Sequence, residues 1–180
     1  MTAKGRAVLS AQEIGRTMAR MAHEISEKNP DTSNIILVGI ITRGVPLARR
    51  LADKIKTITG IDVPCGGLDI TFYRDDIQSK GPDLNAGRTD ISHDINGKTL
   101  ILVDDVLFTG RSIRAAIDAV MDIGRPGRVQ LAVLLDRGHR ELPIRPDYIG
   151  KNIPTARNER VCVKLAETDG EDLAMVAENA

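Results

Sequence analysis

The residues best suited to chemistry lie in one segment, 100–112, where an apolar run ends in two adjacent carboxylates, Asp104 and Asp105. Three apolar residues then lead to a small polar loop, Thr109-Gly110-Arg111-Ser112. Backbone N–H groups and hydroxyls at the start of a helix bind phosphate. Adjacent carboxylates accept hydrogen bonds from a vicinal diol, or hold a magnesium ion through water. Groups of both kinds so close together predict a ribose phosphate as the ligand.

Two other interpretations account for parts of the same segment. Acidic pairs at strand ends also bind magnesium in α/β proteins of the response-regulator and phosphatase-like kinds. A Thr-Gly pair before a helix is often only a turn. Neither interpretation explains why the acidic pair and the polar loop stand only three residues apart, between a strand pattern and a helix pattern. The ribose phosphate is therefore favoured.

The elements that must position this segment alternate between helix and strand patterns. Ser10 and Glu13 form a capping box that opens a helix, and Pro30 marks its end. Further helices are predicted from about Pro46 to Gly60 and from Ser112 to Gly124. Apolar or alternating runs predict strands at residues 35–41, 68–73, 99–103, 129–135 and 161–165. This order predicts an α/β fold with a mainly parallel sheet flanked by helices, whose working loops lie at the carboxyl ends of the strands.

Length and composition suit one globular domain spanning residues 1–180, because 42% of the residues are hydrophobic and 28% are charged. The 25 basic residues equal the 25 acidic ones, which excludes a chain-wide basic coat, so any nucleic-acid contact requires a local patch. No apolar run approaches the ~20 residues of a membrane span, and Met1–Ser10 lacks the apolar stretch of a secretion signal. These features predict a cytoplasmic protein with no membrane partner.

A polar stretch at about residues 74–94 is rich in Asp, Gly, Asn, Lys and Arg and has very few apolar residues. About twenty residues without a packing pattern are unusual inside a compact domain and are commonly functional or disordered. We therefore predict a flexible loop there, although its composition also suits a merely solvated insertion.

The segment 100–112 resembles the signature of the type I phosphoribosyltransferases. In that family the paired acids meet the ribose hydroxyls of phosphoribosyl pyrophosphate (PRPP), and the Thr-Gly-x-Ser/Thr loop binds its 5′-phosphate. The run Val38–Gly44 is similar to the pyrophosphate loop of the family, and the polar stretch 74–94 is similar to its flexible hood. The resemblance implies the type I phosphoribosyltransferase fold.

Three further motifs, Asp69–Asp76, Asp136–Pro143 and Asp147–Thr155, are similar to one group within that family. This group comprises the bifunctional regulators of pyrimidine operons that are also uracil phosphoribosyltransferases. The resemblance implies that uracil displaces pyrophosphate from PRPP to give UMP, with Mg²⁺ bound alongside PRPP. It also implies binding to a stem-loop of pyrimidine-operon leader mRNA in response to UMP or UTP, and a homodimer or higher homo-oligomer.

The resemblance assigns roles to individual residues. The catalytic residues would be Arg43, Asp104, Asp105 and Arg137. The residues that bind substrate would be Thr42, Gly44, Tyr73, Arg74, Asp75, Asp76, Val106, Leu107, Phe108, Thr109, Gly110, Arg111, Ser112, Asp136 and Gly138. No dedicated metal site is expected, because Mg²⁺ would be held through the substrate together with the acidic pair. His139 is not expected to act as a general base, since deprotonation of uracil can be concerted with attack.

The RNA-binding surface implied by the resemblance consists of basic residues on the first helix and in the segment after the base pocket. These are Arg20, His23, Lys28, Arg140, Arg145 and Lys151. Arg and Lys on one surface can meet the phosphates of a folded RNA, with an affinity that falls as salt rises. Two alternatives remain open: a uracil phosphoribosyltransferase of pyrimidine salvage without RNA control, and a nucleotide-sensing regulator with negligible turnover.

Overall fold

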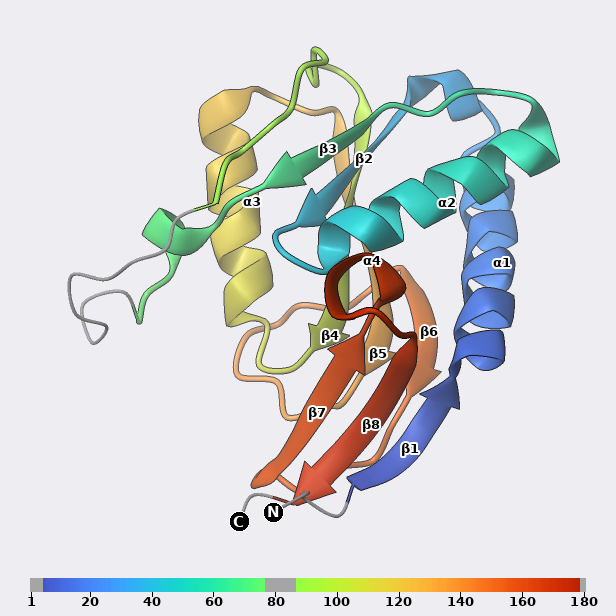
Figure 1. Cartoon of the computed structure of the whole chain (residues 1–180). Coiled ribbons are helices and arrows are strands. Elements are labelled where there is room, and N and C mark those ends of the chain that lie inside the picture. The colour runs from blue at the N-terminus through green and yellow to red at the C-terminus, as the bar shows by residue number, and fades with distance from the viewer. Residues whose placement is uncertain (1–4, 77–86, 179–180) are drawn as a thin grey trace.

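The computed structural model describes residues 5–76 and 87–178 (Figure 1). Its centre is a parallel sheet of five strands in the order β3-β2-β4-β5-β6. The bounds of these strands are β2 Ile35–Ile40, β3 Cys65–Leu68, β4 Thr99–Leu107, β5 Arg128–Asp136 and β6 Tyr148–Asn152. The predicted α/β fold with a mainly parallel sheet is confirmed.

Helices cover both faces of this sheet (Figure 1). Helices α1 (Ala11–Lys28) and α2 (Gly44–Thr59) pack on one face, and α3 (Arg111–Ile123) packs on the other. Successive residues of a strand point to opposite faces, so Ile101 and Val103 of β4 join the core under α1 and α2, whereas Leu100 and Leu102 join the core under α3. The unbroken apolar run of β4 therefore reflects burial on both faces.

The helix boundaries follow the local signals of the sequence. The side chain of Ser10 accepts a hydrogen bond from the Glu13 backbone, and the Glu13 side chain accepts one from the Ser10 backbone, which completes the predicted capping box. Gly60 ends α2 in the left-handed conformation with φ 77°, as a C-terminal glycine does. Among the described residues, no helix is long and apolar enough to cross a membrane.

A second, antiparallel sheet lies beside the carboxyl ends of the main strands (Figure 1). It joins β1 (Gly5–Ser10), β8 (Leu173–Glu178) and β7 (Glu159–Lys164) in the order β1-β8-β7, and the short helix α4 (Ala166–Asp169) connects β7 to β8. Of these three strands, only β7 was expected from the sequence, as residues 161–165, and nothing there separated it from the main sheet. Strand β6, a short edge strand of the main sheet, was not expected either.

Two strand boundaries differ from their predictions. The strand predicted at 68–73 ends at Leu68, and 3-10 turns occupy Thr71–Tyr73 and, elsewhere, Thr32–Asn34. The Asp69 carboxylate accepts hydrogen bonds from both the backbone and the hydroxyl of Thr71, and this local turn replaces strand pairing. Conversely, β4 runs past its predicted end at 103 to Leu107, because its register with β5 continues to the end of that strand.

Candidate functional site

Three loops meet where β2, β4 and β5 end. The parallel register pairs Gly39 of β2 with Val103 of β4, and Leu107 of β4 with Asp136 of β5. Segments that are distant in the sequence therefore emerge side by side, at the edge of the sheet where parallel α/β proteins bind their ligands (Figure 1).

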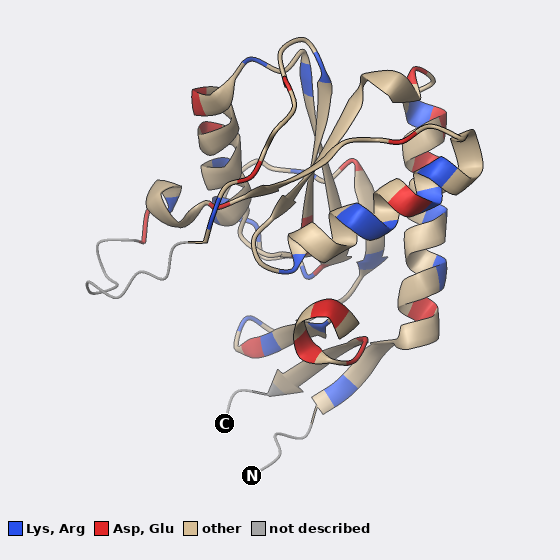
Figure 2. Cartoon of the chain, turned by 45° about the horizontal axis from the view of Figure 1, so that its top comes forward, with Lys and Arg blue, Asp and Glu red and all other residues tan. Residues whose placement is uncertain are grey.

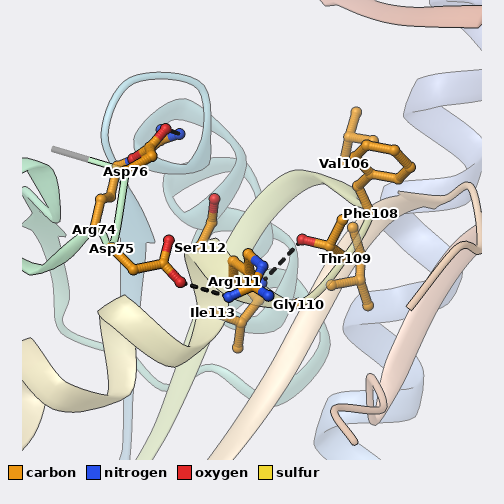
Figure 3. Close-up of a pocket in the computed structure, with 11 residues that line it drawn as sticks. Arg74, Asp75, Asp76, Val106, Phe108, Thr109, Gly110, Arg111, Ser112 and Ile113 are labelled. Carbon is orange, nitrogen blue, oxygen red and sulfur yellow. Dashed lines mark hydrogen bonds and ion pairs between the residues drawn. The ribbon is translucent and has the colours of Figure 1, made fainter. Parts of the chain in front are cut away.

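The loop between β4 and α3 forms the floor of a cavity of about 210 Å³ (Figure 3). Gly110 stands at the start of α3 with φ 93°, a backbone conformation that favours glycine. The hydroxyl of Thr109 accepts a hydrogen bond from the Arg111 backbone at 3.3 Å. The cavity is lined by Arg74, Asp75, Asp76, Val106, Leu107, Phe108, Thr109, Gly110, Arg111, Ser112 and Ile113. A helix N-terminus with free backbone N–H groups and two hydroxyls suits a phosphate.

The acidic pair lies within β4, just before this loop, and both residues are half-buried. Each carboxylate accepts a hydrogen bond from the next backbone N–H at 2.9 Å, Asp104 from Asp105 and Asp105 from Val106. Burial and the neighbouring charge of Asp105 hold the pKa of Asp104 well above its usual range. Within the described part of the chain, neither carboxylate forms an ion pair, so both keep oxygens that can accept hydrogen bonds from ligand hydroxyls.

The loop after β2 brings Arg43 to the same edge. Its guanidinium pairs with Asp169 of α4, and this hydrogen bond, together with the charges of Asp169 and Asp105, raises the pKa of Arg43. The loop lies tightly against the sheet, because a side chain at Gly44 would come within 2.3 Å of the Val103 carbonyl oxygen. The backbone that carries Thr42 and Arg43 is therefore closely packed at the carboxyl end of β2, and neither residue lines the cavity beside the 109–112 loop.

The end of β5 places Arg137 against the loop after β4. The Arg137 guanidinium lies 4.0 Å from the centre of the Phe108 ring and donates hydrogen bonds to the carbonyls of Ala156 and Glu159. Burial lowers the pKa of Arg137, and its buried Nε atom has no hydrogen-bond partner among residues 5–76 and 87–178. The His139 ring meets Phe108 edge to face at 5.9 Å. These side chains form a partly apolar wall that suits a planar base.

Hydrogen bonds connect the segment after β5 to the loop between β4 and α3. Arg140 donates to the Phe108 carbonyl and to Asp136, whose other oxygen accepts from the Gly138 backbone. The backbone N–H of Glu141 donates to the Thr109 carbonyl at 2.9 Å. The loops after β4 and β5 therefore form one connected unit.

The described beginning of the predicted flexible loop, residues 74–76, lies at the mouth of the cavity (Figure 3). The Asp75 carboxylate pairs with Arg111 at 2.6 Å, and Arg74 pairs with Asp76 at 2.8 Å. Tyr73 turns instead toward α3, where its hydroxyl donates to Asp122 at 2.7 Å. Residues 77–86 of the predicted loop lie outside the described residues.

The six predicted RNA contacts fall into two groups. Four lie on α1 and β6, where Arg20 donates to the carbonyls of Ile149 and Gly150, Lys28 to that of Asp147 and Lys151 to that of Val8, while His23 is exposed. The other two, Arg140 and Arg145, lie in the segment between β5 and β6, and only Arg145 is exposed. Figure 2 shows the positive charges spread along α1. The structure therefore gathers four of the six along the α1–β6 edge.

Sequence reasoning missed two acidic residues that contact the predicted site. Asp169 binds Arg43, and Glu141 binds Arg111 at 2.8 Å while its other oxygen binds Arg157. No local signal could have revealed the first contact, because the partners stand 126 positions apart. Among the described residues, no group of three or more His, Cys, Asp or Glu could hold a metal ion.

Comparisons with known proteins fit this geometry. The phosphoribosyl transferase domain family matches residues 5–167. Over 94% of its length, the chain is 57% identical to the bifunctional protein PyrR of Chloroflexus aurantiacus, of which it covers 93%. Proteins of that name from Oceanobacillus iheyensis and Deinococcus radiodurans are 58% and 54% identical, over 92% and 96% of this chain and 93% and 94% of the relatives.

Solved structures share the fold at much lower identity. A hypoxanthine-guanine phosphoribosyltransferase of Bacillus anthracis superposes with a TM-score of 0.72 at 18% identity, covering 99% of this chain and 100% of that one. A hypoxanthine phosphoribosyltransferase of Trypanosoma cruzi gives 0.74 at 20% identity, with coverages of 98% and 96%. The chain belongs to the phosphoribosyl transferase family and, within it, to the group of the bifunctional PyrR proteins.

Proposed function

We propose that this chain transfers the phosphoribosyl group of PRPP to uracil, giving UMP and pyrophosphate, and that it also regulates pyrimidine genes by binding their leader mRNA. The observation that carries the enzymatic part is the single β4–α3 connection, which holds the acidic pair Asp104 and Asp105 and a loop suited to phosphate. The similarity to bifunctional PyrR proteins over nearly the whole chain supports both parts.

The cavity and the strand ends beside it each suit one part of PRPP. The loop Thr109–Ser112 supplies backbone N–H groups and hydroxyls for the 5′-phosphate. Asp104 and Asp105 accept hydrogen bonds from the ribose hydroxyls and so orient the sugar. Arg43, with the backbone of Thr42 and Gly44, holds the diphosphate, where negative charge builds up as the bond to C1′ breaks.

The reaction needs charge stabilisation more than acid–base catalysis. The bond from C1′ to the diphosphate oxygen breaks as the bond to N1 of uracil forms, through an oxocarbenium-like state, and the N1 proton is lost. Arg137, Asp136 and Gly138, beside Phe108, contact the base. Residues 74–76 line the cavity, where they help to keep water from the activated sugar.

The chemistry of the acidic pair fits a magnesium ion bound mainly through the substrate. Two carboxylates are too few for a complete cation site, but they can complete a coordination shell that PRPP oxygens begin. When bound, Mg²⁺ offsets charge on the departing diphosphate.

The double variant Asp104→Asn/Asp105→Asn tests the enzymatic assignment. We expect UMP formation from uracil and PRPP to be lost while the circular dichroism spectrum stays unchanged, because the amides retain the size of the carboxylates. Unchanged turnover would refute the placement of the ribose. A matched control is Asp118→Asn, which removes an exposed carboxylate of α3 that pairs with Arg114.

The regulatory part rests on the basic side chains along α1 and β6, which we assign to the RNA surface together with those of the β5–β6 segment. The surface comprises Arg20, His23, Lys28, Arg140, Arg145 and Lys151. Occupation of the nucleotide site by UMP or UTP signals abundant pyrimidines, and a homodimer would present two such surfaces. A protein that uses PRPP and leader mRNA works in the cytoplasm, where both occur.

Titration of a labelled leader-RNA hairpin tests the regulatory part. We expect tight binding that UMP strengthens and that falls as salt rises, because phosphate contacts release counterions. Arg145→Ala should weaken binding, whereas Arg114→Ala, which removes an exposed arginine of α3 outside the proposed surface, should not. Normal uracil turnover without RNA binding would instead identify a salvage enzyme.

A further inference from the structure

A carboxylate of the second sheet holds the side chain of Arg43 from one side. The Nε and Nη2 groups of Arg43 donate to the two oxygens of Asp169 at 3.1 and 2.8 Å. A guanidinium carries five N–H groups in a fixed fork, and this contact uses one edge of it. Among the described residues, no protein group accepts a hydrogen bond from Nη1. The outer edge of the guanidinium therefore remains available to a ligand.

The turn that contains Asp169 fixes this carboxylate in place. Its Oδ2 atom accepts a hydrogen bond from the Leu165 backbone at 2.9 Å, and its own N–H donates to the Leu165 carbonyl at 2.6 Å. Gly170 ends the turn with φ 80°, and only 19% of the Asp169 side chain is exposed. A carboxylate with so little freedom can hold Arg43 in one orientation.

A second arginine anchors the whole turn to α2. Arg50 makes two hydrogen bonds to Glu167 and two to Asp172. Arg43 and Arg50 stand seven residues apart, which is about two helical turns, so they share one side of α2. Figure 2 shows the acidic residues concentrated on the α4 turn, which Figure 1 places beside the start of α2. Arg50 therefore holds the α4 turn in place beside the end of the β2–α2 loop, where α2 begins.

We infer that Asp169 is a positioning residue of the phosphoribosyl transfer: it orients Arg43 so that the free edge of the guanidinium meets the diphosphate of PRPP. The inference rests on the proposed function and deepens it. Hydrogen bonding between the partners raises the pKa of Arg43 and lowers that of Asp169, so both stay ionised near neutral pH.

A competing role for Asp169 makes the opposite prediction. A carboxylate beside a diphosphate site repels the ligand, and it could also occupy Arg43 in place of phosphate. If Asp169 competed in this way, removal of its charge would tighten diphosphate binding. If Asp169 orients Arg43, the same change weakens binding, because the amide cannot replace the paired carboxylate. The sign of the effect separates the two roles.

The test compares Asp169→Asn with Glu171→Gln, which removes a nearby carboxylate that pairs with Lys164 at 2.7 Å and takes no part in holding Arg43 or Arg50. Calorimetric titration with pyrophosphate and Mg²⁺ measures the diphosphate subsite without turnover, and titration with UMP measures the phosphate loop. For Asp169→Asn we expect Kd for pyrophosphate and KM for PRPP to rise about tenfold. KM for uracil and Kd for UMP should stay constant, and Glu171→Gln should leave all four values unchanged.

Tighter or unchanged pyrophosphate binding by Asp169→Asn would overturn the inference, and so would an equal effect of Glu171→Gln. Such results leave the proposed function intact as long as the unaltered chain converts uracil to UMP. A chain that forms no UMP and binds no UMP overturns both. If Asp169→Asn folds poorly, Asp169→Glu replaces it in the test. This variant keeps the charge but moves it by one methylene, and a smaller loss of pyrophosphate binding is expected.

Discussion

The path of the loop that carries Arg43 depends on the absence of a side chain at Gly39 in β2. A Cβ atom at Gly39 would lie 2.3 Å from the Gly44 carbonyl oxygen and 2.5 Å from the Cα atom of Val45. Both neighbours are backbone atoms, so no side chain can turn aside to make room. Gly39→Ala must therefore push the loop between β2 and α2, which carries Arg43, and the first turn of α2 away from the sheet.

The contact distances set the size of this effect. Real Cβ contacts essentially never fall below 3.0 Å, so the 2.3 Å contact demands a displacement of about 0.7 Å. A misplacement of about 1 Å can cost about 10²-fold in rate, which is about 2.7 kcal/mol. Overpacking costs about 1–3 kcal/mol of stability, and each kcal/mol lowers Tm by about 2–4 °C in a chain of this size. We expect kcat/KM for PRPP to fall about 100-fold.

Steady-state kinetics with varied PRPP, together with UMP titration, checks this prediction. Affinity for UMP should change little, because the 109–112 loop does not touch Gly39. The control is Gly15→Ala on α1, where a new Cβ atom meets no heavy atom within 4 Å. This substitution should stabilise the helix by about 1 kcal/mol and leave turnover unchanged. Wild-type kcat/KM in Gly39→Ala would refute the reasoning, and so would an equal loss of UMP binding, since that indicates general unfolding.

Three further predictions concern stability and reactivity. Because the pKa of Asp104 is raised in the folded chain, the folded state binds more protons than the unfolded state between the two pKa values, so stability falls as pH rises through that window. Asp104→Asn removes this loss, and calorimetry should therefore show a higher Tm than wild type at pH 8. The gain in Tm should disappear toward about pH 4. Burial raises the pKa of the Cys65 thiol to about 11, so iodoacetamide at pH 8 should alkylate it about 100-fold more slowly than free cysteine, as peptide mass spectrometry can measure; equal rates would contradict this burial. The Tyr148 hydroxyl donates to Gln130 and accepts from Asn29, both at 2.9 Å, so Tyr148→Phe should cost about 1–3 kcal/mol in urea unfolding, and an unchanged midpoint would be inconsistent with that buried network.

The parts of the fold that the sequence predicted depend on contacts between near neighbours. The capping box of α1 spans three residues, and the end of α2 needs only a glycine that adopts positive φ. The segment 100–112 combines strand, acidic pair, loop and helix start without interruption, so its arrangement in space follows from its order. The parallel sheet follows in turn, because buried strands alternate with helices.

The parts that could not be predicted depend on partners far apart in the chain. Strand β1 pairs with β8 in a register that joins Gly5 to Ala177, and no local signal pairs two segments at opposite ends of the chain. The contact between Arg43 and Asp169 exists only because that second sheet lies beside the end of β2. Residues 68–73 have a strand-like pattern, but the side chain of Asp69 hydrogen-bonds locally to Thr71 and ends the strand pairing there.

The net charge of the chain is zero, but the charged side chains of the site are paired in different ways. Carboxylates pair with three of its arginines, Arg43 with Asp169, Arg111 with Asp75 and Glu141, and Arg140 with Asp136. In the described part of the chain, Asp104 and Asp105 have no such cationic partner. The arginines therefore offer fixed donors whose charge is largely offset, which favours stabilisation at close contact over attraction from a distance. A polyanionic substrate that arrives with its own Mg²⁺ suits this arrangement, because its cation is drawn to the unpaired carboxylates while its phosphates meet donors already in place.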